Sequence, residues 1–242
     1  MLKRVREVWA GLAGVPVSFG DPVAVSPESL LCPPGWAGVV VIGDAALVTA
    51  PSARTAELMR GGLAGLPVAD WTSPEALRSR LPIEDVLGPA TLAYCSRLAP
   101  PADLTSPSAD LAPPSADLAP PSAVERGAIA DLVASVSEND AGEAGLDEIT
   151  SAAFVIRSEG RVVAAAGYRR WPGDVAHLSV LTAPSHRGRG LAKKVAADAT
   201  ADALEAGLLP QWRARPELSR RVARALGFTE LGAQLSVRLD AG

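Results

Sequence analysis

The residues best suited to chemistry lie in one short stretch of the sequence. Arg187, Gly188, Arg189 and Gly190 follow one another directly, and a helix is expected to begin at Leu191. The start of a helix leaves several backbone N–H groups without partners and carries the positive end of the helix dipole. Glycines let an anion approach the backbone closely, and arginines share the charge of a phosphate. The stretch therefore predicts a binding site for a phosphate or pyrophosphate.

Two predicted elements hold this basic glycine loop. Residues 175–182 are rich in Val and Leu, contain neither Gly nor Pro, and are too few for a stable helix, which favours a buried strand. Pro184 and Ser185 break this strand. Beyond the loop, apolar residues four apart form one helical stripe that ends near Gly207: Leu191, Val195, Ala199 and Ala203. The unit is a strand, a basic loop and a helix.

Two common phosphate-binding motifs do not fit the loop. A P-loop needs Lys followed by Ser or Thr after its last glycine, and here Gly190 is followed by Leu191. A dinucleotide-binding fingerprint needs a third small residue where this chain has Lys193. The anion is therefore expected to belong to another class of ligand.

The loop resembles the acyl-CoA-binding signature of the GNAT superfamily, which is Gln or Arg, two residues, Gly, one residue, then Gly or Ala. Arg187, Gly190 and Ala192 fill this signature. The run Val180-Leu181-Thr182 resembles the end of the family's preceding strand, and Leu226-Gly227-Phe228 resembles the end of its last helix. The resemblance covers about residues 150 to 240. The alternative is a generic strand-to-helix turn whose glycines only permit tight packing.

The resemblance implies an α+β (α/β) fold, the GNAT fold, in which helices flank a mixed and mostly antiparallel sheet, here with an N-terminal α/β region. It implies an acetyl-CoA-dependent N-acetyltransferase that moves an acetyl group from acetyl-CoA to a primary amine of a small molecule or peptide, by direct attack in a ternary complex. The family's cofactor-binding positions fall on Val180, Leu181, Thr182, Arg187, Gly188, Arg189, Gly190, Leu191 and Ala192.

The resemblance also implies candidate catalytic residues. Family members often carry a Glu on the strand before the loop, and His177 occupies the matching position, where its usual pKa of about 6.5 suits a general base. The other interpretation of His177 is a strand histidine satisfied by a backbone partner. Ser219 stands at the family's usual Ser position on the last helix.

Two family residues are missing from this chain. The last helix lacks the usual Tyr, since the only tyrosines are Tyr94 and Tyr168, and Arg215-Pro216-Glu217 stands where an Asn is usual. A second interpretation therefore stays open. The chain could be a catalytically degenerate module that binds acyl-CoA or a protein partner.

Charge is divided unevenly along the 242 residues. From residue 151 onward there are 14 Lys and Arg against 8 Asp and Glu, which leaves 9 of the 23 basic and 19 of the 27 acidic residues for the part before it. A basic C-terminal part suits an anionic cofactor and equally an acidic partner or nucleic acid. The basic residues Arg213, Arg215, Arg220, Arg221 and Arg224 lack the interleaved aromatics that single-strand binding favours, so no nucleic-acid partner is expected.

The remaining composition gives expectations of location and partners. Cys32 and Cys95 show neither metal-ligand nor redox spacing, and no targeting segment or membrane-spanning window is recognised. The simplest expectation is a cytoplasmic protein with reduced thiols, no metal site and no membrane contact. A homodimer stays open.

We expect three regions along the chain. Residues 1–98 have mixed α/β patterning and resemble the N-terminal part of some actinobacterial GNAT proteins, so they are expected to form an accessory region. Residues 99–123 repeat Ala-Asp-Leu every seven residues with prolines between the repeats, which predicts a linker rather than a coiled coil. Residues 124–242 are expected to form the acyltransferase domain.

Local patterns predict the remaining elements. In the accessory region they are a hairpin around Gly43-Asp44, a helix that Ser52 caps and that stops at Gly61-Gly62, and a helix that Ser73-Pro74 begins. In the acyltransferase domain they are a helix over 123–138, a hairpin of 153–157 with 161–166, strands over 208–214 and 231–239, and a helix over 216–226. The first of these helices would bury Val124, Ala128, Ile129, Leu132 and Val136, and the last would bury Leu218, Val222, Ala225 and Leu226.

Overall fold

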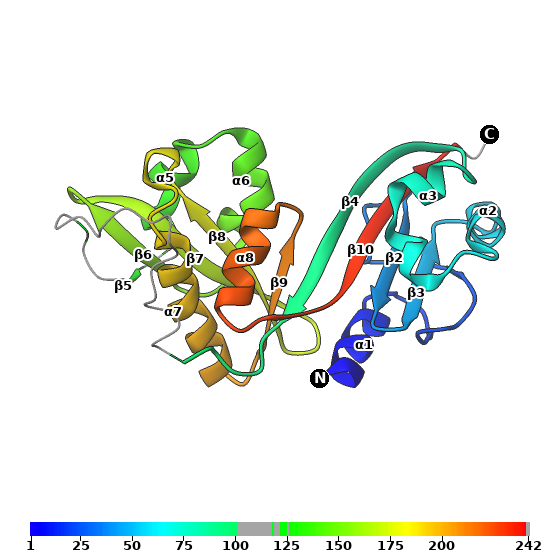
Figure 1. Ribbon diagram of the computed structural model, residues 1–242, viewed down its shortest axis with the longest axis horizontal. Coiled ribbons are helices and arrows are strands. Elements are labelled where there is room, and N and C mark those ends of the chain that lie inside the picture. Colours follow the sequence, from blue (N-terminus) through cyan, green and yellow to red (C-terminus); the bar gives the residue numbers. More distant parts are fainter. Residues whose placement is uncertain (101–117, 119–121, 125, 241–242) are drawn as a thin grey trace. The chain divides into compact units, whose positions relative to one another are not determined.

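The computed structural model describes residues 1–100, 118, 122–124 and 126–240 (Figure 1). Contacts divide the described chain into two units. The first comprises described residues of Met1–Ala93, Arg213–Pro216 and Glu230–Gly242, and the second those of Tyr94–Trp212 and Glu217–Thr229. The units are not contiguous in sequence, because the last strand packs with the N-terminal part. Most of the expected linker lies outside the described residues, so its boundaries at 99 and 123 stay a prediction.

The first unit holds an N-terminal helix, five strands and the helices that pack on them. Its elements are α1 (Leu2–Gly11), β1 (Ala24–Val25), β2 (Ala37–Ile42), β3 (Ala45–Ala50), α2 (Ala53–Leu63), η1 (Val68–Thr72), α3 (Pro74–Arg78), β4 (Ile83–Tyr94) and β10 (Thr229–Leu239). The strand order is β1-β3-β2-β10-β4. The pairs β2–β3 and β2–β10 are antiparallel, and β1–β3 is parallel.

The second unit holds the remaining elements. They are β5 (Ser122–Val124), η2 (Arg126–Ile129), α5 (Ala130–Ala134), α6 (Glu138–Ala144), η3 (Leu146–Glu148), β6 (Ala153–Ser158), β7 (Arg161–Trp171), β8 (Val175–Thr182), η4 (Pro184–His186), α7 (Leu191–Glu205), β9 (Leu209–Ala214) and α8 (Glu217–Ala225). The strand order is β9-β8-β7-β6-β5, antiparallel except for the parallel pair β8–β9. The expected mixed, mostly antiparallel sheet with flanking helices is confirmed.

Several local predictions are confirmed by the elements observed. The hairpin β2–β3 turns at Gly43, whose φ is +63°, and the hairpin β6–β7 joins the two predicted strands around Gly160. Ser52 and Ser73 cap α2 and α3 by accepting hydrogen bonds from Thr55 N and Ala76 N. The stripe Leu191, Val195, Ala199 and Ala203 is buried along α7.

The predicted helix over 123–138 is wrong. Val124 belongs to strand β5, and the following residues form η2, α5 and α6 instead of one helix. Two serines account for the break between α5 and α6. The Ser135 hydroxyl donates to Leu132 O over 2.7 Å at the end of α5, and Ser137 Oγ accepts from Asp140 N as the N-cap of α6. Serines favour such local bonds over continued helix. Ile129 and Leu132 are nevertheless buried, as expected.

The predicted buried face of α8 is also wrong in part. Leu218 is 75% exposed, whereas Ala223 and Leu226 are buried. Ser219 Oγ accepts a hydrogen bond of 3.0 Å from the Trp212 indole N–H of β9. This bond sets the rotation of α8, since the face that carries Ser219 and Ala223 turns toward β9.

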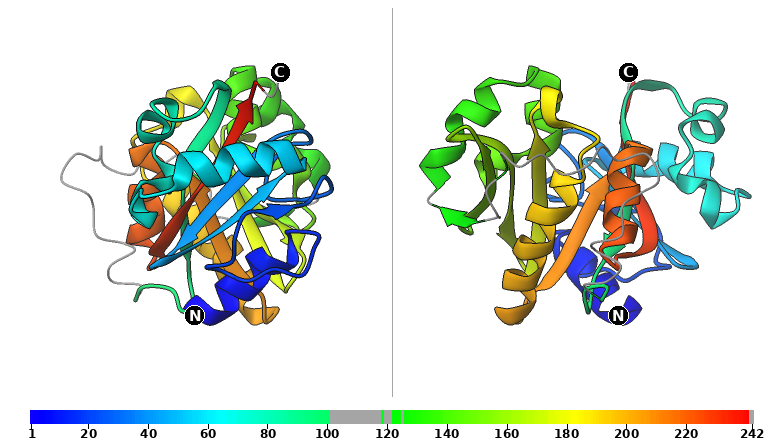
Figure 2. Two further views of the ribbon diagram at one scale, coloured as in Figure 1. Left: turned by 90° about the vertical axis from the view of Figure 1, so that its right-hand side faces the viewer. Right: turned by 60° about the vertical axis from the view of Figure 1, so that its left-hand side comes forward.

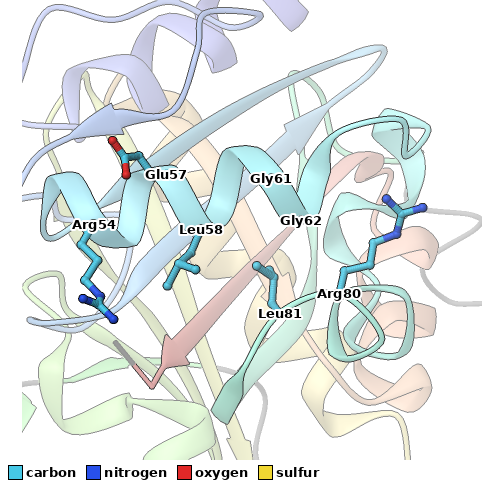
Figure 3. Close-up of a pocket in the computed structure, with 7 residues that line it drawn as sticks. All are labelled: Arg54, Glu57, Leu58, Gly61, Gly62, Arg80 and Leu81. Atoms are coloured by element: carbon cyan, nitrogen blue, oxygen red, sulfur yellow. The ribbon is translucent and has the colours of Figure 1, made fainter. Parts of the chain in front are cut away.

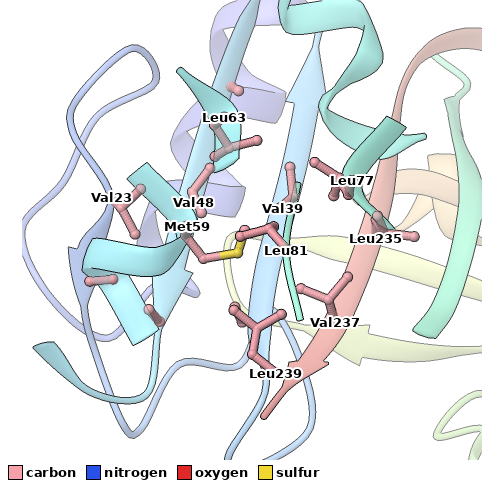
Figure 4. Packing of buried hydrophobic residues seen from close by; sticks show 14 of the residues in the cluster. Val23, Val39, Val48, Met59, Leu63, Leu77, Leu81, Leu235, Val237 and Leu239 are labelled. Carbon is pink, nitrogen blue, oxygen red and sulfur yellow. The ribbon is translucent and has the colours of Figure 1, made fainter. Parts of the chain in front are cut away.

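An apolar cluster forms the core of the first unit beneath α2, which crosses the face of β2 and β3 in the left view of Figure 2. Met59 and Leu63 of α2 pack there with residues of β2, β3 and β10 (Figure 4). Leu81, just before β4, joins the cluster. The prediction that α2 stops at Gly61-Gly62 is wrong, because the helix continues through both glycines to Leu63.

The two glycines have different surroundings, although both line a surface cavity of about 480 Å³ with Leu81 (Figure 3). A Cβ on Gly61 would meet nothing within 4 Å. A Cβ on Gly62 would lie 2.4 Å from Leu81 Cδ2 and 2.5 Å from Leu81 Cγ. The missing side chain of Gly62 therefore makes room for Leu81 in the core.

This difference predicts opposite effects of the same substitution at adjacent positions. Gly61→Ala should raise the free energy of unfolding by about 0.5–1 kcal/mol, since alanine favours a helix over glycine. Gly62→Ala should lower it by about 1–3 kcal/mol, because Leu81 must move from its packed position. Urea unfolding followed by circular dichroism measures both values. Equal effects of the two substitutions would contradict this account of Leu81.

Candidate active site

The register of β8 against β7 assigns its side chains to two faces. Tyr168 pairs with Leu178, and the Tyr168 hydroxyl donates to Asp202 of α7 over 2.6 Å. Residues of β8 with even numbers therefore face α7. Leu181 belongs to the apolar cluster that α5 and its neighbours cover, and the Ser179 hydroxyl donates to Gly145 O at the end of α6. Residues with odd numbers face α5 and α6.

The loop between β8 and α7 has the backbone geometry of an anion site. Gly188 and Gly190 have φ values of +73° and +72°, in the left-handed region. Gly190 is the N-cap of α7, and no side chain of the described residues caps this helix start with a hydrogen bond. The first helical bond observed runs from Lys194 N to Gly190 O. The main-chain N–H groups of the first turn come before this bond, and they point out of the helix start toward the loop.

Arg187 is held at the edge of this loop by two hydrogen bonds from its side chain. Its Nε donates to Thr182 O over 3.3 Å, and its Nη2 donates to Asp140 Oδ2 of α6 over 2.9 Å. The Arg187 guanidinium holds the pKa of Asp140 below its usual range. Both side chains remain partly exposed, so the ion pair is weak enough for a phosphate to compete for the arginine.

Thr182 ends β8 with a buried polar atom that has no partner among the described residues. Its Oγ1 is buried and makes no hydrogen bond. As an even-numbered residue of β8, Thr182 points toward the face on which α7 begins. A buried hydroxyl without a partner costs free energy, and a ligand with a polar group at this place would supply the missing bond.

The cofactor positions expected from the sequence are not equivalent in the structure. The Leu181 and Leu191 side chains are buried in the core, at 5% and 1% exposure, so these two residues offer a ligand only their main chain. Gly188 has open space, since a Cβ there would meet nothing within 4 Å. Among these positions, polar side chains come from Thr182 and the two arginines of the loop.

The parallel ladder between β8 and β9 is short. It pairs Val175 with Leu209, Ala176 with Pro210 and His177 with Gln211. In the described structure β8 continues beyond this register to Thr182, while β9 continues to Ala214. Alternate main-chain groups of β8 between Leu178 and Thr182 are directed away from β7 without a β9 partner in this register.

His177 lies at the last pair of this ladder, on the face of α5 and α6. Its Nδ1 is 2.9 Å from Gln211 Oε1, and Gln211 Nε2 donates to the Tyr94 hydroxyl over 2.7 Å. The imidazole also stacks on Trp171, with ring centroids 4.5 Å apart and planes 17° apart. Side chains, rather than the backbone partner considered from the sequence, hold the Nδ1 edge of this ring.

Ser219 and Tyr168 lie on the opposite face of the sheet from His177. Gln211 shares the face of His177, so the neighbouring Trp212 and its partner Ser219 belong to the other one. Burial and the hydrogen bond to Asp202 raise the pKa of Tyr168 to about 12. Neither tyrosine lies on α8, and the structure does not bring Ser219 to His177.

The sequence analysis missed Gln211, Tyr94 and Asp140. Gln211 carried a usable signal, because it is the one amide in the apolar run Leu208–Trp212 and a buried amide needs partners. Tyr94 and Asp140 carried none, since each meets its partner through more than forty residues of intervening chain.

Similarity to known proteins supports the family suggested by the loop. Residues 150–233 match the family model described as GNAT acetyltransferase. The matched residues make up about a third of the chain, and this part is similar to the GNAT family. The match contains β6, β7, β8, the glycine loop, α7, β9 and α8. No curated protein matches the sequence.

Solved structures resemble this chain at low identity. A GCN5-related N-acetyltransferase-like protein from Streptococcus suis is 19% identical, with 98% of this chain and 99% of that chain covered and a TM-score of 0.52. A GNAT acetyltransferase from Novosphingobium aromaticivorans (21% identity, 64% and 65% covered, TM-score 0.45) and a GCN5-related N-acetyltransferase from Kribbella flavida (22%, 70% and 64%, TM-score 0.45) also match. The chain thus covers just under two thirds of the length of these last two.

Metal-binding clusters and membrane-spanning helices are two further features on which the described residues bear. Among the described residues, no group of three or more His, Cys, Asp or Glu side chains is placed to hold a metal ion. None of the helices described is both long and apolar enough to span a membrane.

The unpartnered hydroxyl of Thr182 predicts a stability gain on its removal. Thr182→Val should raise the free energy of unfolding of the ligand-free protein by about 1 kcal/mol, because a buried unsatisfied group is replaced by a methyl of the same shape. Thr200→Val is the matched control, since the buried Thr200 hydroxyl donates to Ala196 O over 2.6 Å. The control should be destabilised. Urea unfolding checks both, and loss of stability in Thr182→Val would show that its hydroxyl already has a partner.

Proposed function

We propose that the protein transfers an acetyl group from acetyl-CoA to the primary amine of a small molecule or peptide, by direct attack in a ternary complex. One observation carries this proposal: a strand ends in a basic loop with two left-handed glycines, at the start of a helix without a side-chain cap. That arrangement suits a pyrophosphate, and the GNAT family match covers it.

The residues present fit an acyl-CoA. The main-chain N–H groups from Gly188 to Ala192 and the Arg187 and Arg189 side chains would hold the pyrophosphate. The main chain at Val180 and Leu181 and the Thr182 hydroxyl would bind the pantetheine arm beyond the end of the β8–β9 ladder. Acetyl-CoA, when bound, supplies a thioester whose carbonyl carbon can accept an amine and whose thiolate can leave.

His177 would take the proton that the amine must lose. An amine is nucleophilic only when neutral, and imidazole ordinarily titrates near pH 6.5, close to working pH. His177 lies beside the main-chain segment assigned to the pantetheine arm, on the face away from α7. The acceptor amine would therefore approach from the side of α5 and α6. Ser219, bonded to Trp212 on the α7 side, would act on the thiolate side or hold α8 in place.

The cofactor site predicts loss of binding from a side chain at Gly188. Gly188→Val should weaken acetyl-CoA binding at least tenfold, because a branched side chain would occupy the open space beside the loop's N–H groups. Gly207→Val is a matched control at the other end of α7: its φ is +74° and a Cβ there also meets nothing within 4 Å. Both variants carry the same backbone strain. Calorimetric titration measures the affinities, and equal affinities in the two variants would contradict the assigned site.

A second function is favoured by one observation, that α8 carries no tyrosine and both tyrosines of the chain are bonded elsewhere. The chain would then bind acyl-CoA, or a protein partner, without catalysis. Acetyl-CoA binding with no turnover of a broad amine panel would support this function. Measurable acetylation of any amine would exclude it.

The base role of His177 predicts a change in the pH profile. With His177 present, kcat/KM should rise with pH on the acid side, because deprotonation produces the neutral imidazole that accepts a proton. His177→Asn should lower the rate by about 10²–10⁴-fold and flatten this limb. His186→Asn is the control, since His186 bonds to its neighbour Ser185 in the loop. An acid limb that survives in His177→Asn would assign the base elsewhere.

A further inference from the structure

A chain of three polar side chains runs through the second unit at the end of the β8–β9 ladder. His177 Nδ1 meets Gln211 Oε1 at 2.9 Å, and Gln211 Nε2 meets the Tyr94 hydroxyl at 2.7 Å. Tyr94 and Gln211 are both 0% exposed. Neither residue belongs to the glycine loop or to the positions that resemble family site residues.

The hydrogen-bonding capacity of an amide fixes which side chain donates and which accepts in these two hydrogen bonds. An amide nitrogen only donates, so the Tyr94 oxygen accepts from Gln211 Nε2. An amide oxygen only accepts, so the Gln211 oxygen takes a hydrogen from His177. The hydrogen between these two side chains must therefore be carried by His177 Nδ1.

We propose that Gln211 and Tyr94 are positioning residues, which hold His177 in the tautomer with hydrogen on Nδ1 and the lone pair on Nε2. Tyr94 orients the amide, and the amide orients the imidazole. The consequence for catalysis rests on the proposed acetyl transfer. There, Nε2 takes the amine proton as the C–N bond forms and the C–S bond breaks, while Nδ1–H remains bonded to Gln211 Oε1.

The surroundings of the ring restrict its orientation further. Trp171 stacks on one face of the imidazole, and Gln211 is the paired residue of the adjacent strand. With its face and its Nδ1 edge held, the ring cannot exchange its nitrogens by rotation without breaking the stack and the hydrogen bond. The nitrogen that accepts the proton thus keeps one place relative to β8.

Charged groups near His177 explain why a neutral amide suits this position. Arg169 of β7 pairs directly with His177 and therefore lies on the same face. Its guanidinium is bonded to Glu148 of η3, which balances its charge. Among the three hydrogen-bonded side chains His177, Gln211 and Tyr94, the other titratable group is Tyr94. An amide oxygen adds orientation without adding a further carboxylate, which would favour the charged imidazolium.

Histidine ring nitrogens report this tautomer directly by ¹⁵N nuclear magnetic resonance. The protein has two histidines, so the spectrum is simple. The signals that disappear in the His177→Asn variant are those of His177. The ligand-free wild-type protein should show His177 protonated on Nδ1 at neutral pH. A wild type protonated mainly on Nε2 would overturn the proposal.

Three variants separate positioning from general structural support. Tyr94→Phe removes the acceptor of the amide, so it should mix the two tautomers of His177 and lower kcat about tenfold with little change in KM. Gln211→Glu supplies an acceptor again, so it should keep hydrogen on Nδ1 and raise the pKa of His177. Tyr168→Phe removes the other tyrosine hydroxyl, which bonds Asp202 on the opposite face, and should leave the tautomer unchanged.

The outcomes also distinguish this inference from the proposed function. If the tautomer is unchanged in Tyr94→Phe while circular dichroism shows a folded protein, Tyr94 does not position the ring and the proposal fails. If the tautomer responds as expected but no amine is acetylated, the positioning network stands and the acetyl-transfer function fails. If the Gln211→Glu variant moves the acid limb of the rate profile to higher pH, both stand together.

Discussion

The register of β8 between β7 and β9 is the constraint on which the whole candidate site depends. Because side chains alternate along a strand, that register directs His177 to one face and Thr182 to the other. A slip of one residue would exchange the two faces and separate His177 from Gln211. Eight paired residues with β7 fix the register, and the Tyr168–Asp202 bond ties the adjacent strand to α7.

The short ladder with β9 completes this arrangement. Three pairs bring Gln211 beside His177, and beyond them alternate main-chain groups of β8 have no β9 partner in the described register. Strand pairing therefore does two things within a few residues: it builds the support of the candidate base, and then it ends where a ligand would need main-chain partners. The same strand leads directly into the glycine loop and the start of α7.

Much of this unit could be predicted from the sequence, because the signals were local. The four-residue stripe from Leu191 marked α7, and the short apolar run from Val175 marked β8 with its observed bounds. The glycines at 188 and 190 indicated the anion loop because left-handed backbone favours glycine. Each of these features depends on residues adjacent in the chain or within one helical turn.

The failures came where tertiary contacts outweighed local patterns. A hydrophobic pattern over 123–138 was compatible with one helix, but serine hydrogen bonds and pairing of β5 with β6 divided it. Leu218 looked like a core residue, yet the Trp212–Ser219 bond turned α8 so that Leu218 is exposed. Gln211 and Tyr94 meet across more than a hundred residues. No local pattern encodes such a contact.

A buried polar chain of this kind is costly unless every member is satisfied. Burying an amide and a phenol without partners would lose several kcal/mol, whereas a connected network recovers most of that loss and has one preferred direction. Apolar residues at 94 and 211 would fill the same volume with less risk of an unsatisfied group. What the network adds over such residues is a defined orientation for the imidazole of His177.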